Sequence, residues 1–163
     1  MTLKITEICF KIEQLSEILT NLNWRISCAE SCTGGWVAKL FTDQAGSSSW
    51  FERGYVTYSN LAKQEMLGVS NQSLDKFGAV SEAVVREMAI GACKQAGTQV
   101  SLAISGIAGP SGGSEDKPVG LVWFAWNIDG KVETYSEIFQ GDRGAVREQA
   151  VITAIVLLLK YLS

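Results

Sequence analysis

Apolar residues recur along much of the chain at intervals of three or four positions, which is typical of helices that bury one face. This spacing predicts an amphipathic helix over residues 6–22 and a closing helix over residues 143–162. Two further helix starts are indicated by residues that favour the N-cap position, Asn60 and Ser81, the second with Glu82 well placed in the first turn. The predicted helices cover residues 6–22, 36 onward, 60–66, 81–95 and 143–162.

Between these helices lie short segments rich in aromatic and β-branched residues, a composition that favours strands. The predicted strands cover residues 24–28, 50–58, 100–104, 119–127 and 131–139. The last two flank the dipeptide Asp129-Gly130, which favours the tight turn of a β-hairpin.

Helices and strands alternate through the first part of the chain, and the hairpin follows near the end. This order predicts an α/β protein whose mixed sheet is covered by helices on both faces. In such sheets, ligands bind beyond the carboxyl ends of the strands. Two Gly-rich segments, 29–35 and 105–114, fall at such ends, and so does Tyr58. We therefore expect a functional site where these segments meet.

The length of 163 residues, without linkers or repeats, indicates a single domain over residues 1–163. The formal net charge is -3, whereas proteins that bind nucleic acid usually have an excess of positive charge. The most apolar segment, 150–159, is about half of the ~20 residues needed to cross a bilayer, and the first ten residues lack a signal-peptide run. Four cysteines without a CxxC pair are typical of reduced thiols. We therefore expect a cytoplasmic protein with neither membrane nor nucleic-acid partners.

The chain contains no histidine, which shortens the list of possible mechanisms. This absence excludes Ser-His-Asp and Cys-His catalysis as well as histidine-ligated zinc. Any acid–base chemistry must therefore come from Lys, Tyr, Asp, Glu or Cys.

The turn Glu30-Ser31-Cys32-Thr33-Gly34-Gly35 is the first candidate for chemistry. A hydroxyl between a strand and a helix lies near unpaired backbone N–H groups and the positive end of the helix dipole. Such a position stabilises an oxyanion or binds a phosphate. A purely structural turn capped by Ser or Thr has the same composition and is the alternative.

Lys63 is the candidate base. If Asn60 caps the helix, Lys63 lies in the first turn, where the dipole disfavours its charge, and partial burial lowers the pKa of the amine further. A lysine of lowered pKa is suited to general-base catalysis, and Ser31 activated by Lys63 is a variant of the serine-hydrolase triad. Tyr58 is placed to relay a proton or to orient the lysine. The alternative is an exposed lysine without a chemical role.

Phosphate-binding groups are predicted in two places. The segment 105–114 offers many N–H groups and small side chains to a phosphate or ribose. Arg143 and Arg147 lie four positions apart and so share one helix face, and arginine pairs with phosphate oxygens through two parallel hydrogen bonds. The alternative is a solvated helix start with its own Asp142–Arg143 pair.

Six blocks of this sequence stand in a fixed order: Ala29-Glu30-Ser31-Cys32-Thr33-Gly34-Gly35, Phe51-Glu52-Arg53-Gly54-Tyr55-Val56-Thr57-Tyr58-Ser59-Asn60, Gly78-Ala79-Val80-Ser81-Glu82, Ser105-Gly106-Ile107-Ala108-Gly109-Pro110, Lys117-Pro118-Val119-Gly120 and Gly141-Asp142-Arg143. Together they resemble the CinA carboxy-terminal domain family, and the resemblance covers residues 6–162.

The resemblance implies a three-layer α/β/α fold and the activity of a nicotinamide-nucleotide amidase, which converts nicotinamide mononucleotide into nicotinate mononucleotide and ammonia in pyridine nucleotide recycling. It implies Ser31 as the nucleophile, Lys63 as its base and Tyr58 nearby, with neither metal nor cofactor. It also implies the stand-alone form, without the amino-terminal domain of longer CinA proteins. Two alternatives stay open: a cysteine nucleophile, with Cys32, Lys63 and Glu30, and a catalytically silent member that binds the nucleotide without turnover.

The oxyanion of the amidase reaction is expected to be held by backbone N–H groups of Thr33 to Gly35 or, alternatively, of Gly46-Ser47-Ser48. The candidate substrate-binding residues are Glu30, Thr33, Gly34, Gly35, Gly46, Ser48, Ser105, Gly106, Gly109, Arg143 and Arg147. The expected ligand is a pyridine mononucleotide, and the expected assembly is a homodimer, because two-fold oligomers are common among soluble proteins.

Overall fold

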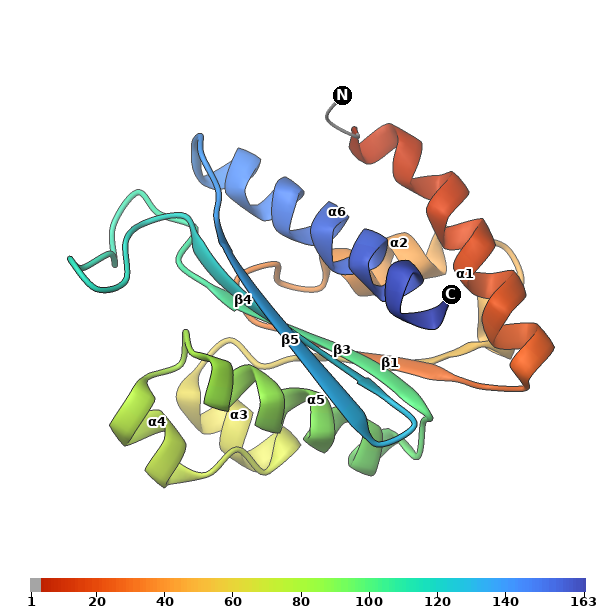
Figure 1. Cartoon of the computed structure of the whole chain (residues 1–163), viewed down its shortest axis with the longest axis horizontal. Helices are drawn as coiled ribbons and strands as arrows, with labels where there is room; N and C mark the ends of the chain where they lie inside the picture. The colour runs from red at the N-terminus through yellow and green to blue at the C-terminus, as the bar shows by residue number, and fades with distance from the viewer. Residues whose placement is uncertain (1–3) are drawn as a thin grey trace.

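A five-stranded mixed sheet forms the middle of the protein in a computed structural model, which describes residues 4–163 (Figure 1). The strands are β1 (Ile26–Glu30), β2 (Phe51–Val56), β3 (Val100–Gly106), β4 (Leu121–Ile128) and β5 (Lys131–Ile138), in the spatial order β2-β1-β3-β4-β5. Strand β1 pairs in parallel with both β2 and β3, whereas the β3–β4 and β4–β5 pairs are antiparallel. The predicted mixed sheet is confirmed.

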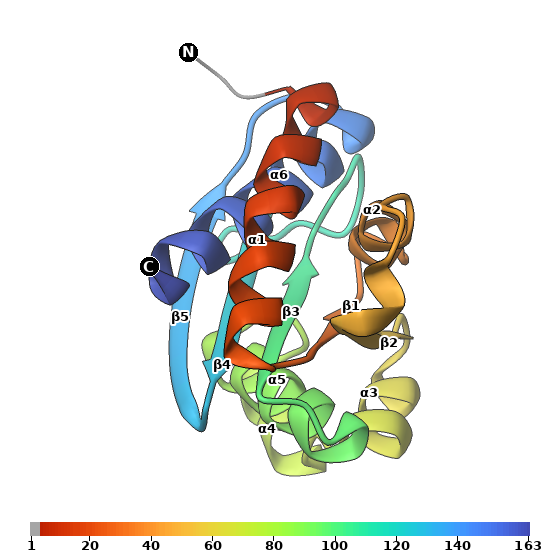
Figure 2. The same ribbon diagram turned by 90° about the vertical axis from the view of Figure 1, so that its right-hand side faces the viewer.

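Helices cover both faces of the sheet. One face carries α1 (Ile8–Leu22), α2 (Trp36–Thr42) and α6 (Arg143–Leu162), and the other carries α3 (Asn60–Leu67), α4 (Asn71–Phe77) and α5 (Glu82–Ala96). Figure 2 shows α1 and α6 packed side by side over the sheet. Two 3-10 helices, Ile5–Glu7 and Ser47–Ser49, precede α1 and β2. The three-layer α/β/α fold implied by the resemblance is confirmed.

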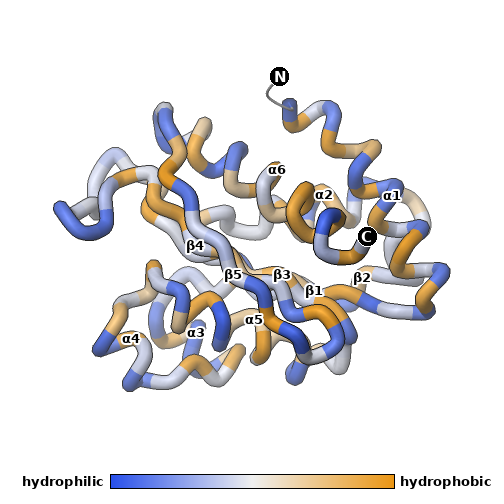
Figure 3. Tube along the Cα trace, viewed as in Figure 1, coloured by the Kyte–Doolittle hydropathy of each residue, from blue (hydrophilic) through white to orange (hydrophobic). Residues whose placement is uncertain are grey.

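Two hydrophobic cores follow from the alternation of side chains along the strands. Leu102 of β3 belongs to the core beneath α1, α2 and α6, while its neighbour Ala103 belongs to the core beneath α5. Ala29, Ala103 and Ala125 face α5 from the central strands, and such small side chains let this helix approach the sheet closely. Along α1, α5 and α6 the hydropathy alternates between apolar and polar positions, as expected of helices that bury one face (Figure 3).

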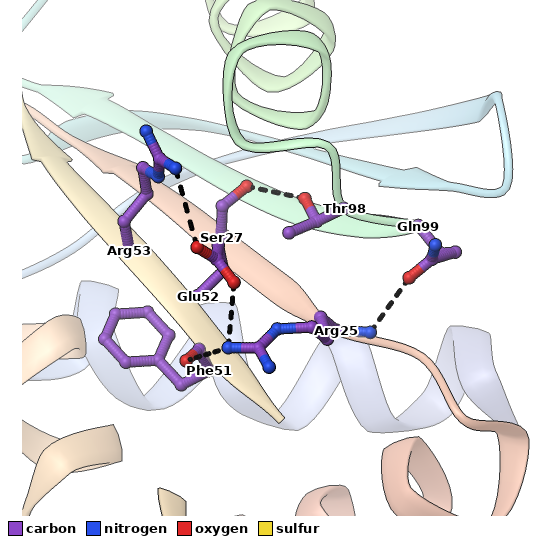
Figure 4. A network of polar contacts seen from close by, with 7 residues as sticks. All are labelled: Arg25, Ser27, Phe51, Glu52, Arg53, Thr98 and Gln99. Atoms are coloured by element: carbon purple, nitrogen blue, oxygen red, sulfur yellow. Dashed lines mark hydrogen bonds and ion pairs between the residues drawn. The ribbon is translucent and has the colours of Figure 1, made fainter. Parts of the chain in front are cut away.

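A polar network ties together the amino ends of the three parallel strands (Figure 4). The backbone N–H of Arg25 donates to Gln99 Oε1 at 3.0 Å, and the Arg25 guanidinium pairs with the Glu52 carboxylate at 2.8 Å. The hydroxyls of Ser27 and Thr98 lie 3.0 Å apart and share a hydrogen bond. These contacts fix the register of β1 against its neighbours, so that the carboxyl ends of the strands align at the opposite edge.

Several predicted elements match the structure, and others require correction. The Asp129-Gly130 hairpin, the Ser81 N-cap and the 143–162 helix are confirmed. The cap of α3 is Ser59 rather than Asn60: the Ser59 hydroxyl accepts from the Ala62 N–H at 3.0 Å. Strand β1 begins two residues later than predicted, and α4 was not predicted. No helix within residues 4–163 is both long and apolar enough to span a bilayer.

Candidate active site

The carboxyl ends of β1, β2 and β3 meet at one pocket. Because β1 lies between the other two and all three run in parallel, the residues that follow them become neighbours. The pocket has a volume of about 260 Å³ and is lined by Ser31, Cys32, Tyr58, Asn60, Lys63, Ala79, Val80, Ser105, Gly106, Ala108 and Arg143. Figure 1 shows the starts of α5 and α6 at the same end of the sheet as the loop that follows β3. The predicted convergence of these segments is confirmed.

Ser31 and Lys63, 32 positions apart in the sequence, are in direct contact in this pocket. Lys63 Nζ lies 3.1 Å from Ser31 Oγ, within hydrogen-bond distance. Ser31 is held in place from behind, because its backbone N–H donates to the Ile104 carbonyl of β3 at 3.0 Å. This is the separation that proton transfer between a nucleophile and its base requires.

The surroundings of Lys63 favour the neutral amine. The side chain is almost fully buried, and burial lowers the pKa of its amine. None of the ion pairs formed within residues 4–163 involves this lysine. Its Nζ also donates to the carbonyls of Thr57, at 2.8 Å, and Tyr58, at 3.3 Å. A neutral amine has two hydrogens for these two carbonyls, which leaves its lone pair for the Ser31 hydroxyl.

Glu30 shapes the nucleophile turn instead of facing the pocket. Its buried carboxylate accepts hydrogen bonds from the N–H groups of Gly35, Val37 and Ala38, at 3.1, 3.1 and 2.9 Å, and so caps the start of α2. Gly34 and Gly35 adopt positive φ values of 61° and 100°, which glycine accepts readily, so the chain can turn sharply just before α2 begins. The carboxylate of Glu30 is therefore directed at the start of α2, and Glu30 is not among the residues that line the pocket.

Cys32 is a poor nucleophile where it lies. Burial raises the pKa of its thiol to about 11, so the reactive thiolate is scarce near neutral pH. The carboxylate of Glu30, the third member of the cysteine alternative, is already engaged by backbone N–H groups. The local chemistry therefore favours Ser31 as the nucleophile.

Arg143 lies exposed at the rim of the pocket. Its Nη1 donates to the Gly109 carbonyl at 2.8 Å, and its Nη2 lies 3.4 Å from the Tyr58 hydroxyl, which is itself largely exposed. Because Lys63 is occupied with Ser31, Arg143 is the cation of the lining that faces outward. It is therefore placed to meet an anionic group that extends from the pocket toward solvent.

Some predicted site residues lie behind the pocket or far from it. Thr33, Gly34, Gly35 and Gly109 shape the surrounding turns without lining the pocket, and Arg147 contacts the back of the nucleophile turn. Gly46 and Ser48 precede β2, beside the start of β1. They are separated from Ser31 by the length of β1, roughly 15 Å at 3.3 Å per residue. The segment Gly46-Ser47-Ser48 therefore does not line the pocket that contains Ser31.

The lining contains three residues that the sequence did not assign to it: Asn60, Ala79 and Val80. Ala79 and Val80 precede α5, and the Ala79 carbonyl accepts from the Ser105 hydroxyl at 2.8 Å, which joins two walls of the pocket. Both residues belong to the Gly78–Glu82 block, which carries part of the family resemblance and could have indicated that they lie at the site.

Another cavity of the described chain is larger but has a different lining. A larger cavity of about 460 Å³, between α1 and α6, includes Lys11, Glu17 and Lys160 in its lining and none of the candidate site residues. Among residues 4–163 no group of three or more Cys, Asp or Glu is placed to hold a metal ion.

Comparison with known proteins places this chain in a family. The family model described as the CinA C-terminal domain matches residues 10–162. The chain is 58% identical over 144 residues to the nicotinamide-nucleotide amidohydrolase PncC of Escherichia coli K12, covering 88% of this chain and 87% of that protein. It is 53% identical over 148 residues to the protein of that name from Enterobacter agglomerans, covering 90% of each.

A solved structure shares the fold over the full length. The competence/damage inducible protein CihA of Agrobacterium tumefaciens superposes with a TM-score of 0.94 at 39% identity, covering 100% of both chains. The chain therefore belongs to the CinA C-terminal domain family.

Proposed function

We propose that this protein hydrolyses the carboxamide of nicotinamide mononucleotide, giving nicotinate mononucleotide and ammonia in pyridine nucleotide recycling. The observation that carries the proposal is the contact of 3.1 Å between buried Lys63 Nζ and Ser31 Oγ inside a pocket. The names of the relatives from Escherichia coli and Enterobacter agglomerans support the substrate.

The reaction follows from the geometry of this pair. Neutral Lys63 accepts the hydroxyl proton of Ser31 while Oγ bonds to the carboxamide carbon, and the carbonyl electrons move onto oxygen. When this tetrahedral intermediate collapses, the C–N bond breaks and Lys63 returns the proton to the departing ammonia. Water then attacks the Ser31 ester by the same route, which releases the carboxylate and restores the hydroxyl.

The pocket also accounts for a nucleotide rather than free nicotinamide. The carboxamide must reach Ser31, which is buried beside Lys63, so the ribose and the phosphate extend toward the exposed side chains of Tyr58 and Arg143. Arg143 stands at the mouth of the pocket beside Tyr58, where a guanidinium pairs well with a phosphate. We therefore assign the phosphate to Arg143, while Asn60 and Ser105 supply further polar groups to the pocket lining.

The direct test is to incubate the purified protein with nicotinamide mononucleotide and to measure ammonia and nicotinate mononucleotide together. We expect the two products in equal amounts, and much slower release from nicotinamide, which lacks the phosphate. A folded protein that binds the mononucleotide without releasing ammonia would overturn the enzymatic proposal and leave the silent binding protein in its place.

Replacing Arg143 by glutamine is expected to weaken substrate binding more than it slows the chemistry. A charged hydrogen bond to phosphate contributes about 1.5–3 kcal/mol, which corresponds to a rise in KM of roughly 10- to 100-fold with a small change in kcat. Steady-state kinetics with nicotinamide mononucleotide measure both constants. Arg53→Gln, at an exposed position on β2, is the matched control and should behave as wild type. An unchanged KM for Arg143→Gln would place the phosphate elsewhere.

Replacing Cys32 by alanine is expected to leave turnover close to that of the wild type, because the serine mechanism makes no use of the thiol. Thiol alkylation and ammonia release, measured on wild type and Cys32→Ala in parallel, check this. Loss of activity in a folded Cys32→Ala protein would favour the cysteine alternative instead.

We further propose that the protein acts in the cytoplasm as a homodimer. All four cysteines are free thiols, which suits a reducing compartment.

The proposed dimer interface lies on the side of β2 and α3, where Val56, Leu61 and Met66 expose apolar side chains. Light scattering in solution tests the assembly, and a monomer at micromolar concentration would contradict it.

A further inference from the structure

Arg147 does not face the pocket, although the sequence marked it as a phosphate ligand. Its Nε donates to the Cys32 carbonyl at 2.9 Å, and its Nη2 donates to the Thr33 carbonyl at 3.1 Å. The guanidinium also lies over the Trp36 ring, 5.5 Å from the ring centroid. The donors of this arginine are therefore directed at the nucleophile turn, and its place behind the pocket keeps it from a phosphate at the mouth.

The backbone N–H groups of the nucleophile turn can be accounted for one by one. Between Ser31 and Ala38, within the described chain, only the N–H groups of Cys32 and Thr33 donate no hydrogen bond to another residue. Thr33 is fully buried, whereas Cys32 lines the pocket directly after the nucleophile. A free N–H at this position is the usual oxyanion donor of serine hydrolases that place the nucleophile on a strand-to-helix turn.

Arg147 constrains the free Cys32 N–H through the peptide groups of the nucleophile turn. In a trans peptide the C=O and the following N–H point in opposite directions, so fixing one fixes the other. Arg147 holds the Thr33 carbonyl, and the Gly34 N–H of the same peptide donates to the Ser31 carbonyl at 3.1 Å. The peptide that contains the Ser31 carbonyl also contains the Cys32 N–H. On the other side, Arg147 holds the Cys32 carbonyl directly.

We propose that Arg147 is a positioning residue that fixes and polarises the Cys32 N–H as the oxyanion donor. A positive charge at one end of a hydrogen-bonded chain of peptides strengthens each bond along it and makes the terminal N–H a better donor. The inference rests on the proposed amide hydrolysis, because the oxyanion is the former carboxamide oxygen. It also explains why Arg147 lies on the first turns of α6, next to Arg143, but faces the turn rather than the pocket.

The first test compares Arg147→Lys and Arg147→Gln with wild type. Lysine keeps the charge but cannot hold two carbonyls in a fixed plane, and glutamine loses the charge as well. Both variants should lower kcat by roughly 10²-fold, as expected for a misplaced oxyanion donor, with KM for nicotinamide mononucleotide unchanged. The pH profile should keep its midpoint, because the Ser31–Lys63 pair is untouched. Arg53→Gln serves as the control.

The second test uses a fluorophosphonate, which does not depend on the natural substrate. Ser31 Oγ bonds to phosphorus, fluoride leaves, Lys63 takes the hydroxyl proton, and the phosphoryl oxygen occupies the oxyanion site. The labelling rate, followed by mass spectrometry, should fall in Arg147→Lys by the same factor as kcat. A folded Arg147→Lys that labels as fast as wild type, or a raised KM with kcat unchanged, would overturn the inference. If wild type labels but releases no ammonia, the proposed function fails while labelling still tests Arg147.

Discussion

Replacing Ser31 by alanine is expected to lower kcat by at least about 10⁴-fold, the largest effect of any single substitution in this protein. The hydroxyl is the atom that bonds to the substrate carbon, and no other hydroxyl stands within reach of Lys63 Nζ among the hydrogen bonds of the described chain. The Ser31→Ala protein should still bind nicotinamide mononucleotide with an affinity near that of wild type, because the phosphate and ribose contacts remain. Calorimetric titration and ammonia release measure the two effects separately.

Ser48→Ala is the matched control, since it removes a serine hydroxyl at the other end of β1. It should leave kcat and KM unchanged. Appreciable ammonia release by Ser31→Ala, free of contaminating enzyme, would remove Ser31 from the mechanism.

Replacing Lys63 by methionine is expected to lower kcat by roughly 10²- to 10⁴-fold, the contribution typical of a general base. Methionine fills a similar volume in the buried position, so the loss reports the amine rather than a cavity. Thermal unfolding confirms that the variant is folded before its kinetics are compared. Turnover within a few-fold of wild type would assign the proton transfer to another group.

The pH dependence of the wild type follows from the same amine. Burial lowers the pKa of Lys63 below the ordinary lysine value of about 10.4, and the neutral form is the active one, so kcat/KM should rise with pH and level off above the pKa of the free enzyme.

Stability should change over the same range. Between the folded and unfolded pKa values of Lys63 the unfolded chain binds more protons, so its contribution to the free energy of unfolding increases with pH up to about 10.4. Lys63→Met should lack this increase, which unfolding of both proteins across the alkaline range would show.

Elements that depend on local chemistry were predictable from the sequence. The Asp129-Gly130 turn has φ values of 49° and 86°, which Asp and Gly tolerate, so the hairpin is set by its own two residues. The Ser81 hydroxyl accepts from the Val84 N–H at 3.3 Å, a contact within one helical turn. The capping position of α3 was missed by one residue because Ser59 and Asn60 are both good caps and stand side by side.

Contacts between distant segments were predictable only in part. The pairing of Ser31 with Lys63 followed from the absence of histidine, from the strand ends and from the family resemblance. The sequence carries no comparable signal that the Glu30 carboxylate would turn back onto α2, or that Arg147 would face the nucleophile turn instead of the pocket. Those outcomes depend on how α2 and α6 pack on the sheet. Helix α4 has only seven residues, too few for a clear apolar period.

The most direct test of the Ser31–Lys63 mechanism is to trap the acyl-enzyme with hydroxylamine during turnover of nicotinamide mononucleotide. The mechanism predicts that the hydroxamate of nicotinate mononucleotide forms at the expense of nicotinate mononucleotide, in proportion to hydroxylamine. Ser31→Ala should form none, and Cys32→Ala should form as much as wild type. Steady ammonia release with nicotinate mononucleotide as the sole product at every hydroxylamine concentration would contradict the mechanism, because water would then attack the carboxamide directly.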